Sequence, residues 1–460
     1  MMKDQRKPQG KTRWGLLLFT TLLLASMLLA ACQSAAPAAP TAAPKPAAPT
    51  AAPAAPAATA APAAPAATAA PAKAAEAKTV TVKVGFQPAY TGPVAINSEP
   101  QSQGMNDYMV SVNDQGGIPY KDPKTGETVR AKLDIVWEDN SYDTARILSI
   151  YNRQKGAGVK AMVTYGTASG VALADQVSKD KMPLLFIGAP NEAVLKPTPV
   201  YVTSIGNLYD WQGKSFAKWA KAQWKESRAP RLGIIYTDAT WGLMATAGLP
   251  EFAQQLGWEV AGKEVVKAPL TDSSIEMKRL FGGKPDWIFT ALTAGDMAVA
   301  MKDTARLGFK DQAKWVSFTY GFDPASFQKV ADAETNGVNG WLYWAVETEK
   351  SLPGVAEAAA GAQKYRQRDL TNMYLQGWAT SKVFVEGGIK GALGSVGFDA
   401  LTPEAINTAL HSIKNLDTGG LFPPANTTDA RPFIVSKARL VQWQDHKINI
   451  LTDWQEGSLQ

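Results

Sequence analysis

The chain has 460 residues, a formal net charge of +6 at pH 7 and one cysteine. A single cysteine excludes intrachain disulfide bonds and cysteine-rich metal sites. The length is too great for one hydrophobic core and predicts two domains of ordinary size.

The first 31 residues have the layout of an export signal. Residues 1–13 carry five basic side chains and one acidic side chain, and residues 14–31 form an apolar run without charge. A basic segment followed by an apolar segment that ends in small residues is typical of a secretory signal peptide. The alternative is a single transmembrane anchor, because about 18 apolar residues are just long enough to span a bilayer.

The sequence Leu29-Ala30-Ala31-Cys32 at the end of this run resembles the lipobox of bacterial lipoproteins. The resemblance implies that the Cys32 thiol is lipidated, that the chain is cut just before it, and that the protein is anchored on the extracytoplasmic side of the cell membrane. Several acyl chains make a durable anchor, because each buried CH₂ contributes about 0.8 kcal/mol. Removing residues 1–31 takes away five basic residues and one acidic residue and lowers the net charge by four, from +6 to +2. The basic balance of the chain therefore does not indicate nucleic-acid binding.

Residues 32–79 are predicted to form a linker. From residue 33 they are almost entirely Ala, Pro and Thr, and the sequence AAPAAPAAT occurs twice in succession, at 51–59 and 60–68. Frequent prolines prevent a helix, and the absence of large apolar side chains prevents a core, so a semi-extended, polyproline-like or disordered segment is expected. Residues 33–78 could span about 140 Å if fully extended, enough to hold the folded part clear of the membrane.

From residue 80 onward, strand-like apolar runs alternate with helical patterns. The predicted strands are 80–87, 133–139, 160–166, 183–188, 200–206, 231–238, 259–266, 286–292 and 314–320. Runs that are apolar on both faces and alternate with helices predict parallel sheets covered by helices. Because the pattern restarts at residue 231, we expect an α/β protein with two doubly wound lobes.

The loops that follow these strands are the candidate ligand site. In doubly wound sheets the ligand crevice lies beyond the carboxyl ends of the strands. The loops are 88–95, 165–170, 188–192, 206–213, 237–242, 292–296 and 319–323. They are rich in Gly, Thr, Ser, Asn, Tyr and Trp, which suit a small, partly apolar ligand. The alternative for each single loop is ordinary turn chemistry, which also favours Gly, Ser, Asn and Asp.

Common catalytic motifs fail in this sequence. The segment GNLYDWQGKS (206–215) has six residues between Gly206 and Gly213, whereas a phosphate-binding P-loop needs four. The two histidines, His411 and His446, fit a helix surface and a hairpin tip. Without a free thiol or a well-placed histidine, nucleophilic and zinc chemistries lack their usual groups, so we predict no catalytic residue, metal or cofactor.

Several short motifs occur in a fixed order between residues 80 and 455. They are PAYTGP (88–93), NDQGGI (113–118), the acidic strand end Glu138-Asp139, Thr240-Trp241-Gly242 and ARLGF (305–309). This order resembles that of type I periplasmic-type solute-binding proteins, and most closely the branched-chain amino acid (Leu/Ile/Val-binding) receptors of ABC transporters. The first motif departs from the family's P-x-T-G-P turn by one extra residue.

The resemblance implies how the chain is divided between two lobes. In the family, three hinge crossings join the lobes, and here they map near residues 206, 339 and 417. Lobe 1 would contain 80–206 and 340–416, and lobe 2 would contain 207–339 and 417–460. The C-terminal segment 431–454 alternates apolar and polar residues and is therefore expected to pair as strands on lobe 2.

The resemblance also implies a set of ligand-binding residues. In the family, a hydroxyl and backbone N–H groups after the third strand hold the ligand carboxylate, the loop after the fourth strand adds contacts, and an aromatic residue from lobe 2 covers the ligand. The first group maps to Gly166, Thr167, Ala168 and Ser169, the second to Gly188, Ala189 and Asn191, and the third to Trp241. Tyr90, Tyr209, Thr293 and Tyr320 complete the predicted set.

The predicted site departs from the family at the ligand's ammonium group. Where family members use acids from lobe 2, this chain carries Tyr209 and Tyr320, with Asp210 and Asp323 only nearby. A buried ammonium without a partner is costly. The predicted ligand is therefore small and either amino acid-like, an aromatic or aliphatic carboxylate, or a small amide, and the departure counts against the first of these.

The leading functional interpretation is a lipid-anchored, monomeric receptor that closes over a small molecule and delivers it to the membrane subunits of an ABC permease. The alternative is a ligand sensor whose closed form is recognised by a signalling partner. Permease genes next to the gene for this protein would favour transport over sensing. An anchored enzyme is a third interpretation, which the missing catalytic groups disfavour.

Overall fold

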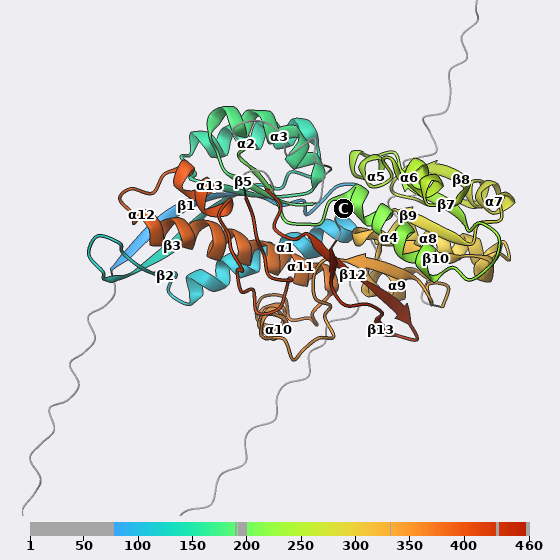
Figure 1. Ribbon diagram of the computed structural model, residues 1–460. Coiled ribbons are helices and arrows are strands. Elements are labelled where there is room, and N and C mark those ends of the chain that lie inside the picture. The colour runs from blue at the N-terminus through green and yellow to red at the C-terminus, as the bar shows by residue number, and fades with distance from the viewer. Residues whose placement is uncertain (1–77, 189–190, 192–199, 332, 429–431, 457–460) are drawn as a thin grey trace, which may run out of the picture. The chain divides into compact units, whose positions relative to one another are not determined.

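The computed structural model describes residues 78–188, 191, 200–331, 333–428 and 432–456 (Figure 1). The predicted signal peptide, Cys32, most of the predicted linker and Ala189 lie outside the described residues. All of the described residues belong to one compact unit. Among the described residues, no helix is both long and apolar enough to cross a membrane.

The N-terminal part of this unit is built on a first sheet of six strands. They are β1 (Thr79–Gln87), β2 (Ile118–Lys121), β3 (Thr128–Trp137), β4 (Met162–Tyr165), β5 (Leu184–Ile187) and β6 (Val202–Ser204). Their order is β2-β3-β1-β4-β5-β6, and every pair is parallel except β2 with β3. Because β1 has β3 on one side and β4 on the other, the switch point of this doubly wound sheet lies at β1.

Helices cover both faces of the first sheet. They are α1 (Ala95–Asp114) on one face and α2 (Thr144–Gly156) and α3 (Thr167–Asp180) on the other (Figure 1). Successive strand residues point to opposite faces, so Met162 packs into the core beneath α2 and α3, whereas Val163 packs into the core on the opposite face. This two-sided burial explains why the strand sequences are apolar throughout.

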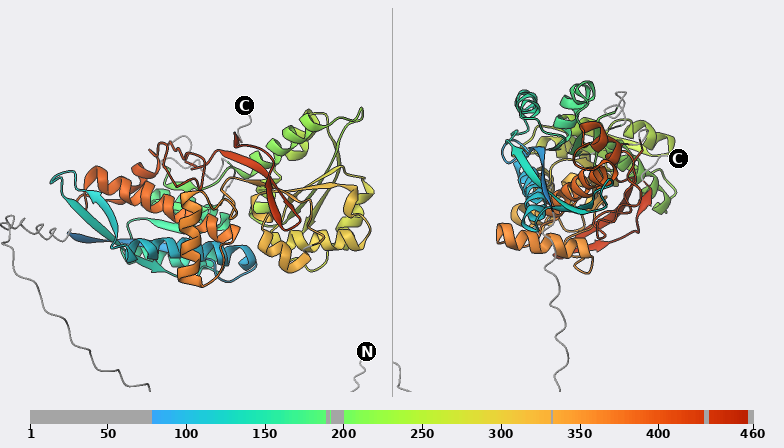
Figure 2. Two further views of the ribbon diagram at one scale, coloured as in Figure 1. Left: turned by 90° about the horizontal axis from the view of Figure 1, so that it is seen from below. Right: turned by 90° about the vertical axis from the view of Figure 1, so that its left-hand side faces the viewer.

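The second sheet has eight strands. They are β7 (Arg231–Thr237), β8 (Glu259–Val266), β9 (Trp287–Ala291), β10 (Lys314–Ser317), β11 (Asn339–Leu342), β12 (Lys437–Gln444), β13 (Lys447–Ile450) and β14 (Gln455–Glu456). The order is β13-β12-β11-β10-β9-β7-β8, with β14 paired to β12. The predicted C-terminal strands are confirmed, because β12 and β13 form an antiparallel hairpin on β11 (Figure 2).

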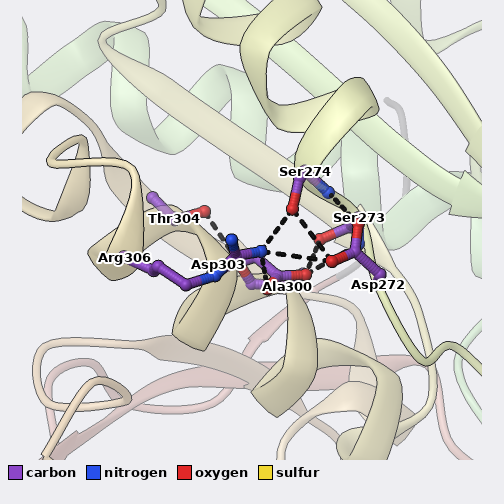
Figure 3. Close-up of polar contacts among 7 residues, drawn as sticks. All are labelled: Asp272, Ser273, Ser274, Ala300, Asp303, Thr304 and Arg306. Carbon is purple, nitrogen blue, oxygen red and sulfur yellow. Dashed lines mark hydrogen bonds and ion pairs between the residues drawn. The ribbon is translucent and has the colours of Figure 1, made fainter.

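The helices of the second sheet follow its strands in alternation. They are α4 (Tyr209–Gln223), α5 (Thr240–Ala245), α6 (Leu249–Gln255), α7 (Ser274–Gly282), α8 (Ala294–Arg306) and α9 (Pro324–Ala331), with short 3₁₀ turns η2 (Lys310–Gln312) and η3 (Thr319–Gly321). A polar cluster ties α7 to α8 (Figure 3). The carboxylate of Asp303 accepts hydrogen bonds from the N–H and hydroxyl of Ser273, the N-cap of α7, at 2.7 and 3.0 Å. Arg306 bridges Asp303 to Asp272. The polar groups of these side chains bond to one another, so the cluster has a structural role.

The chain returns to the first sheet before it ends. The returning helices are α10 (Pro353–Arg366), α11 (Asn372–Lys382), the π-helix η4 (Val383–Ile389), α12 (Lys390–Val396) and α13 (Pro403–Leu410). Helix α11 crosses α1 so closely that a Cβ added at Gly377 would overlap the carbonyl oxygen of Gln101, and one at Gly104 would overlap that of Tyr374. The two helix backbones are therefore in direct contact.

The predicted α/β architecture with three passages between two sheets is confirmed, but strand pairing shifts two of the passages. Strand β11 pairs in the second sheet through Leu342, beyond the expected crossing near 339. Near the third passage, Ser204 of β6 forms backbone hydrogen bonds with Pro432 and Ile434, so these two residues, well beyond 417, lie at the first sheet. These segments are short and pair through their backbones, so their sequences carry no apolar pattern from which the position of a passage could be predicted. The lobe ranges themselves stay a prediction.

Candidate ligand-binding site

A cavity lies where the carboxyl ends of the strands of the two sheets face each other. Its empty volume is about 350 Å³, mouth included. Its lining from the first-sheet side is Val94, Asn97, Tyr142, Tyr165, Gly166, Thr167 and Ile187, and from the second-sheet side Tyr209, Trp241, Thr293, Phe318 and Tyr320. Val94 follows β1 and Trp241 follows β7, the switch-point strands where doubly wound sheets bind ligands.

The lining is aromatic and hydroxyl-rich. Six of the twelve lining side chains are aromatic, and none of the twelve is charged. Aromatic faces bury a flat or apolar ligand body, and hydroxyl groups fix its oxygen atoms. The cavity is thus suited to a small molecule with an apolar or aromatic body and oxygen substituents.

Six of the predicted site residues line this cavity together. They are Gly166, Thr167, Tyr209, Trp241, Thr293 and Tyr320. Each follows a strand of one of the two sheets, as predicted for residues of the post-strand loops. Their assignment to ligand binding stays a prediction.

The N-terminus of α3 faces the cavity through Gly166 and Thr167. Gly166 has φ +91° and caps the helix, and a Cβ there would overlap the ring of Tyr142, so the position requires glycine. The first N–H groups of a helix have no partner within it and favour a negatively charged oxygen. Burial raises the pKa of the Tyr142 hydroxyl, and the backbone N–H of Ala168, which lies near this hydroxyl, lowers that pKa less strongly.

Hydrogen bonds cross the cavity from one sheet to the other. Thr167 Oγ1 and the Tyr209 hydroxyl share a hydrogen bond of 2.8 Å. The Asn97 side chain of α1 donates to the carbonyl oxygen of Tyr320 at 2.9 Å and accepts from the N–H of Ala294, the first residue of α8, at 3.3 Å. Asn97 therefore caps a helix of the second-sheet side from the first-sheet side.

Trp241 lines the cavity and also packs against other residues of the second-sheet side. Its ring is stacked on that of Phe318 with centroids 5.3 Å apart and planes 4° apart, and the residue is 5% exposed. Tyr209 and Tyr320 contact the same Phe318 ring edge-on. The indole thus belongs to an aromatic cluster that forms one wall of the cavity.

Several predicted residues do not line the cavity. The Ser169 hydroxyl donates to the carbonyl oxygen of Tyr165, one helical turn back, at 2.7 Å. The Gly188 carbonyl accepts from Ser204 at 2.7 Å. The Tyr90 N–H donates to Asp139, and its ring lies edge-on to Trp137. The remaining members, Ala168 and Asn191, are also absent from the described lining.

Sequence reasoning missed half of the lining. The additional residues are Val94, Asn97, Tyr142, Tyr165, Ile187 and Phe318. Val94 and Tyr165 lie inside the predicted post-strand loops 88–95 and 165–170. Nothing distinguished them from their neighbours in these loops, so the predicted set did not include them. Asn97 lies within a helix and Tyr142 in a turn with φ +58°, and neither carries a sequence signal that points to the cavity.

The two nearby acids have structural partners. Asp210 pairs with Lys214 at 3.0 Å, one helical turn further along α4. Asp323, 4% exposed, accepts hydrogen bonds from the N–H and hydroxyl of Ser326 at the start of α9, and burial raises the pKa of its carboxyl. Neither residue lines the cavity, where Tyr209 and Tyr320 stand instead.

The histidines differ from expectation at one position. His446 lies in the β12–β13 turn, as predicted. His411 is buried rather than on a helix surface, because its Nε2 lies 3.2 Å from Thr203 Oγ1 in β6. In the described part of the chain, no group of three or more His, Cys, Asp or Glu residues is arranged to hold a metal ion.

Comparisons with known proteins agree with this architecture. A family model described as periplasmic binding protein matches residues 81–447. The chain is 24% identical over 400 residues to the Leu/Ile/Val-binding protein homolog 7 of Brucella melitensis, covering 81% of this chain and 92% of the relative.

Solved structures share the fold at lower identity. A branched-chain amino acid ABC transporter protein of Thermus thermophilus with bound valine has a TM-score of 0.72 and 16% identity, covering 83% of this chain and 97% of the other. A solute-binding protein of an ABC transporter from Rhodopseudomonas palustris, in complex with 3,4-dihydroxybenzoic acid, has a TM-score of 0.65 and 17% identity. The match covers 82% of this chain and 98% of the other.

The family match covers the first sheet from residue 81, the second sheet as far as the start of β13, and every described residue of the cavity lining. It agrees with the prediction of a binding protein rather than an enzyme, and with two lobes of the type I architecture. The chain belongs to the periplasmic binding protein family.

Proposed function

We propose that this protein is a lipid-anchored, extracytoplasmic solute receptor of an ABC importer. It binds a small carboxylate or amide with an apolar or aromatic body, closes its two lobes over that ligand, and delivers it to the membrane subunits of a permease. Ligand drives closure because it contacts both lobes at once and so binds the closed state more tightly.

The observation that carries the proposal is the composition of the cavity wall. Aromatic rings, hydroxyl groups and the N-terminus of α3 meet there without a charged side chain among the lining residues. The helix N-terminus favours a negatively charged or strongly polar oxygen, and the rings favour an apolar body. Valine and 3,4-dihydroxybenzoate, the ligands of the two related structures, are both carboxylates.

The same wall argues against an amino acid. An ammonium group enclosed here would need a carboxylate partner, and Asp210 and Asp323 are engaged elsewhere. Leaving a buried ammonium unpaired is costly. We therefore expect the ligand to lack a cationic group.

Two measurements on the purified protein test this function. Mass spectrometry of small molecules released on denaturation should identify a carboxylate or amide without an amine. Calorimetry should then show binding of that compound and markedly weaker binding of valine. Tight binding of valine, or release of a cationic compound, contradicts the proposed ligand class.

The lipid anchor is tested by Cys32→Ser. We expect this variant to keep residues 1–31 and to incorporate no labelled fatty acid, because the modified thiol is absent. Intact mass and metabolic labelling measure both outcomes. Ser34→Ala, two residues further on, is the matched control and should be processed as the unmodified sequence is. Normal processing and lipidation of Cys32→Ser would rule out the anchor.

Asn97→Ala is expected to weaken ligand binding about 10-fold, because it removes two hydrogen bonds between the lobes, each contributing about 0.5–1.5 kcal/mol. The ligand-free protein should also become more open in small-angle X-ray scattering. Asn106→Ala on the same helix is the control, since that side chain bonds the adjacent Asp107. Unchanged affinity and unchanged scattering for Asn97→Ala would mean that these bonds do not favour the closed state.

A further inference from the structure

Tyr165 lines the cavity, but the predicted set of ligand-binding residues does not include it. It is the last residue of β4 and pairs with Ile187 of β5, and both side chains line the cavity. The residue is only 7% exposed. Its ring lies edge-on to that of Tyr142, with centroids 6.0 Å apart. Strand pairing and ring packing therefore hold the side chain in one place.

The other tyrosine hydroxyl groups of the lining have partners within the protein. That of Tyr209 bonds Thr167, and that of Tyr320 bonds Tyr343 at 2.7 Å. That of Tyr142, whose pKa is raised by burial, lies near the backbone N–H of Ala168, which lowers this pKa less strongly. The Tyr165 hydroxyl is close enough to those of Tyr142 and Tyr209 to interact electrostatically, but within the described chain it forms no hydrogen bond.

The Tyr165 side chain lines the cavity, and its hydroxyl has no hydrogen-bond partner among the described residues. Polar groups at such positions in native proteins are usually satisfied, so a molecule that enters the cavity can supply the missing partner. Desolvation raises the pKa of the Tyr165 hydroxyl well above its ordinary value. The group therefore stays protonated and can donate a hydrogen bond.

We propose that Tyr165 is a specificity-determining residue whose hydroxyl donates to an oxygen atom of the bound ligand. The inference rests on the proposed function and narrows it, because the ligand must then present an acceptor oxygen to β4. Tyr165 directly precedes Gly166 and the N-terminus of α3, so two kinds of donor come from adjacent residues. Together they select a carboxylate or amide oxygen over an apolar group of the same shape.

The first test needs no ligand and compares two Tyr→Phe variants of the full-length protein. Tyr151→Phe is the matched control, because this buried tyrosine of the first-sheet side donates to Asp180 at 2.7 Å. Tyr165→Phe should leave the melting temperature unchanged or raise it, whereas Tyr151→Phe should lower it. If Tyr165→Phe lowers the melting temperature as much as the control does, the hydroxyl has a partner in the protein and the proposal is overturned.

The second test measures binding of 3,4-dihydroxybenzoate and benzamide by calorimetry. Tyr165→Phe should weaken binding of the carboxylate about 10- to 100-fold, as expected for a hydrogen bond to a charged group, and weaken the amide less. Tyr151→Phe should bind both as the unmodified protein does. If the unmodified protein binds either probe and Tyr165→Phe binds it equally well, this inference fails and the proposed function stands. If the unmodified protein binds neither probe and releases no carboxylate or amide, the proposed function fails together with the inference.

Discussion

Trp241→Ala is expected to weaken ligand binding by about 1–3 kcal/mol, in the range of losing a buried aromatic anchor. The indole forms a wall of the cavity, and its stacking on Phe318 keeps that wall in place before the ligand arrives. An aromatic ring held in advance loses little conformational entropy on binding. Removing it takes away ligand contact area and opens the cavity to water.

The stacking also means that Trp241→Ala removes packing within the second-sheet side, so affinity and stability must be measured on the same samples. Calorimetry gives the dissociation constant, and thermal unfolding of the ligand-free protein gives the stability. Trp224→Ala is the matched control, because Trp224 ends α4 away from the cavity lining and donates to the carbonyl of Arg228. A folded Trp241→Ala protein that binds the ligand with full affinity would exclude the indole from the binding site.

The fold could be predicted because each lobe repeats one pattern. Strands such as Met162–Tyr165 are buried on both faces, so every residue in them is apolar or small enough to pack, and helices separate them at regular intervals. The β12–β13 hairpin could be predicted because apolar and polar residues alternate along its sequence. By contrast, β11 has four residues and begins with Asn339 and Gly340, so nothing in its sequence distinguishes it from a loop.

The site could be predicted only as far as strand ends determine it. Loops after strands are brought together by the sheets themselves, and Thr167, Trp241 and Tyr320, all in such loops, line one cavity. Which way a side chain points is decided later, by local hydrogen bonding. Ser169 follows Thr167 by two residues, yet it bonds a backbone carbonyl of the preceding turn. Asn97 reaches the cavity only because α1 meets α8, a contact between distant segments that leaves no mark in the sequence near either one.

Gly377→Ala is expected to destabilise the protein by about 3 kcal/mol, the upper part of the range for overpacking a core. The added Cβ would overlap the carbonyl oxygen of Gln101 in α1, and a backbone atom cannot rotate away as a side chain can. The helices α1 and α11 would have to separate, and the side chains packed along both would lose contact. Because α1 also carries Asn97 at its N-terminal end, this shift should weaken ligand binding as well.

Chemical denaturation of the ligand-free protein measures this effect. Gly394→Ala is the matched control, because Gly394 lies in α12 with no atom within 4 Å of an added Cβ. That substitution should stabilise the protein by up to about 1 kcal/mol, since alanine favours a helix more than glycine does. The two changes add the same methyl group to a helical glycine, so opposite signs isolate the contact between α1 and α11 as the cause. A loss below about 1 kcal/mol for Gly377→Ala would mean that the helices can separate without disturbing the core, and that their close crossing is not what holds α11 on the first sheet.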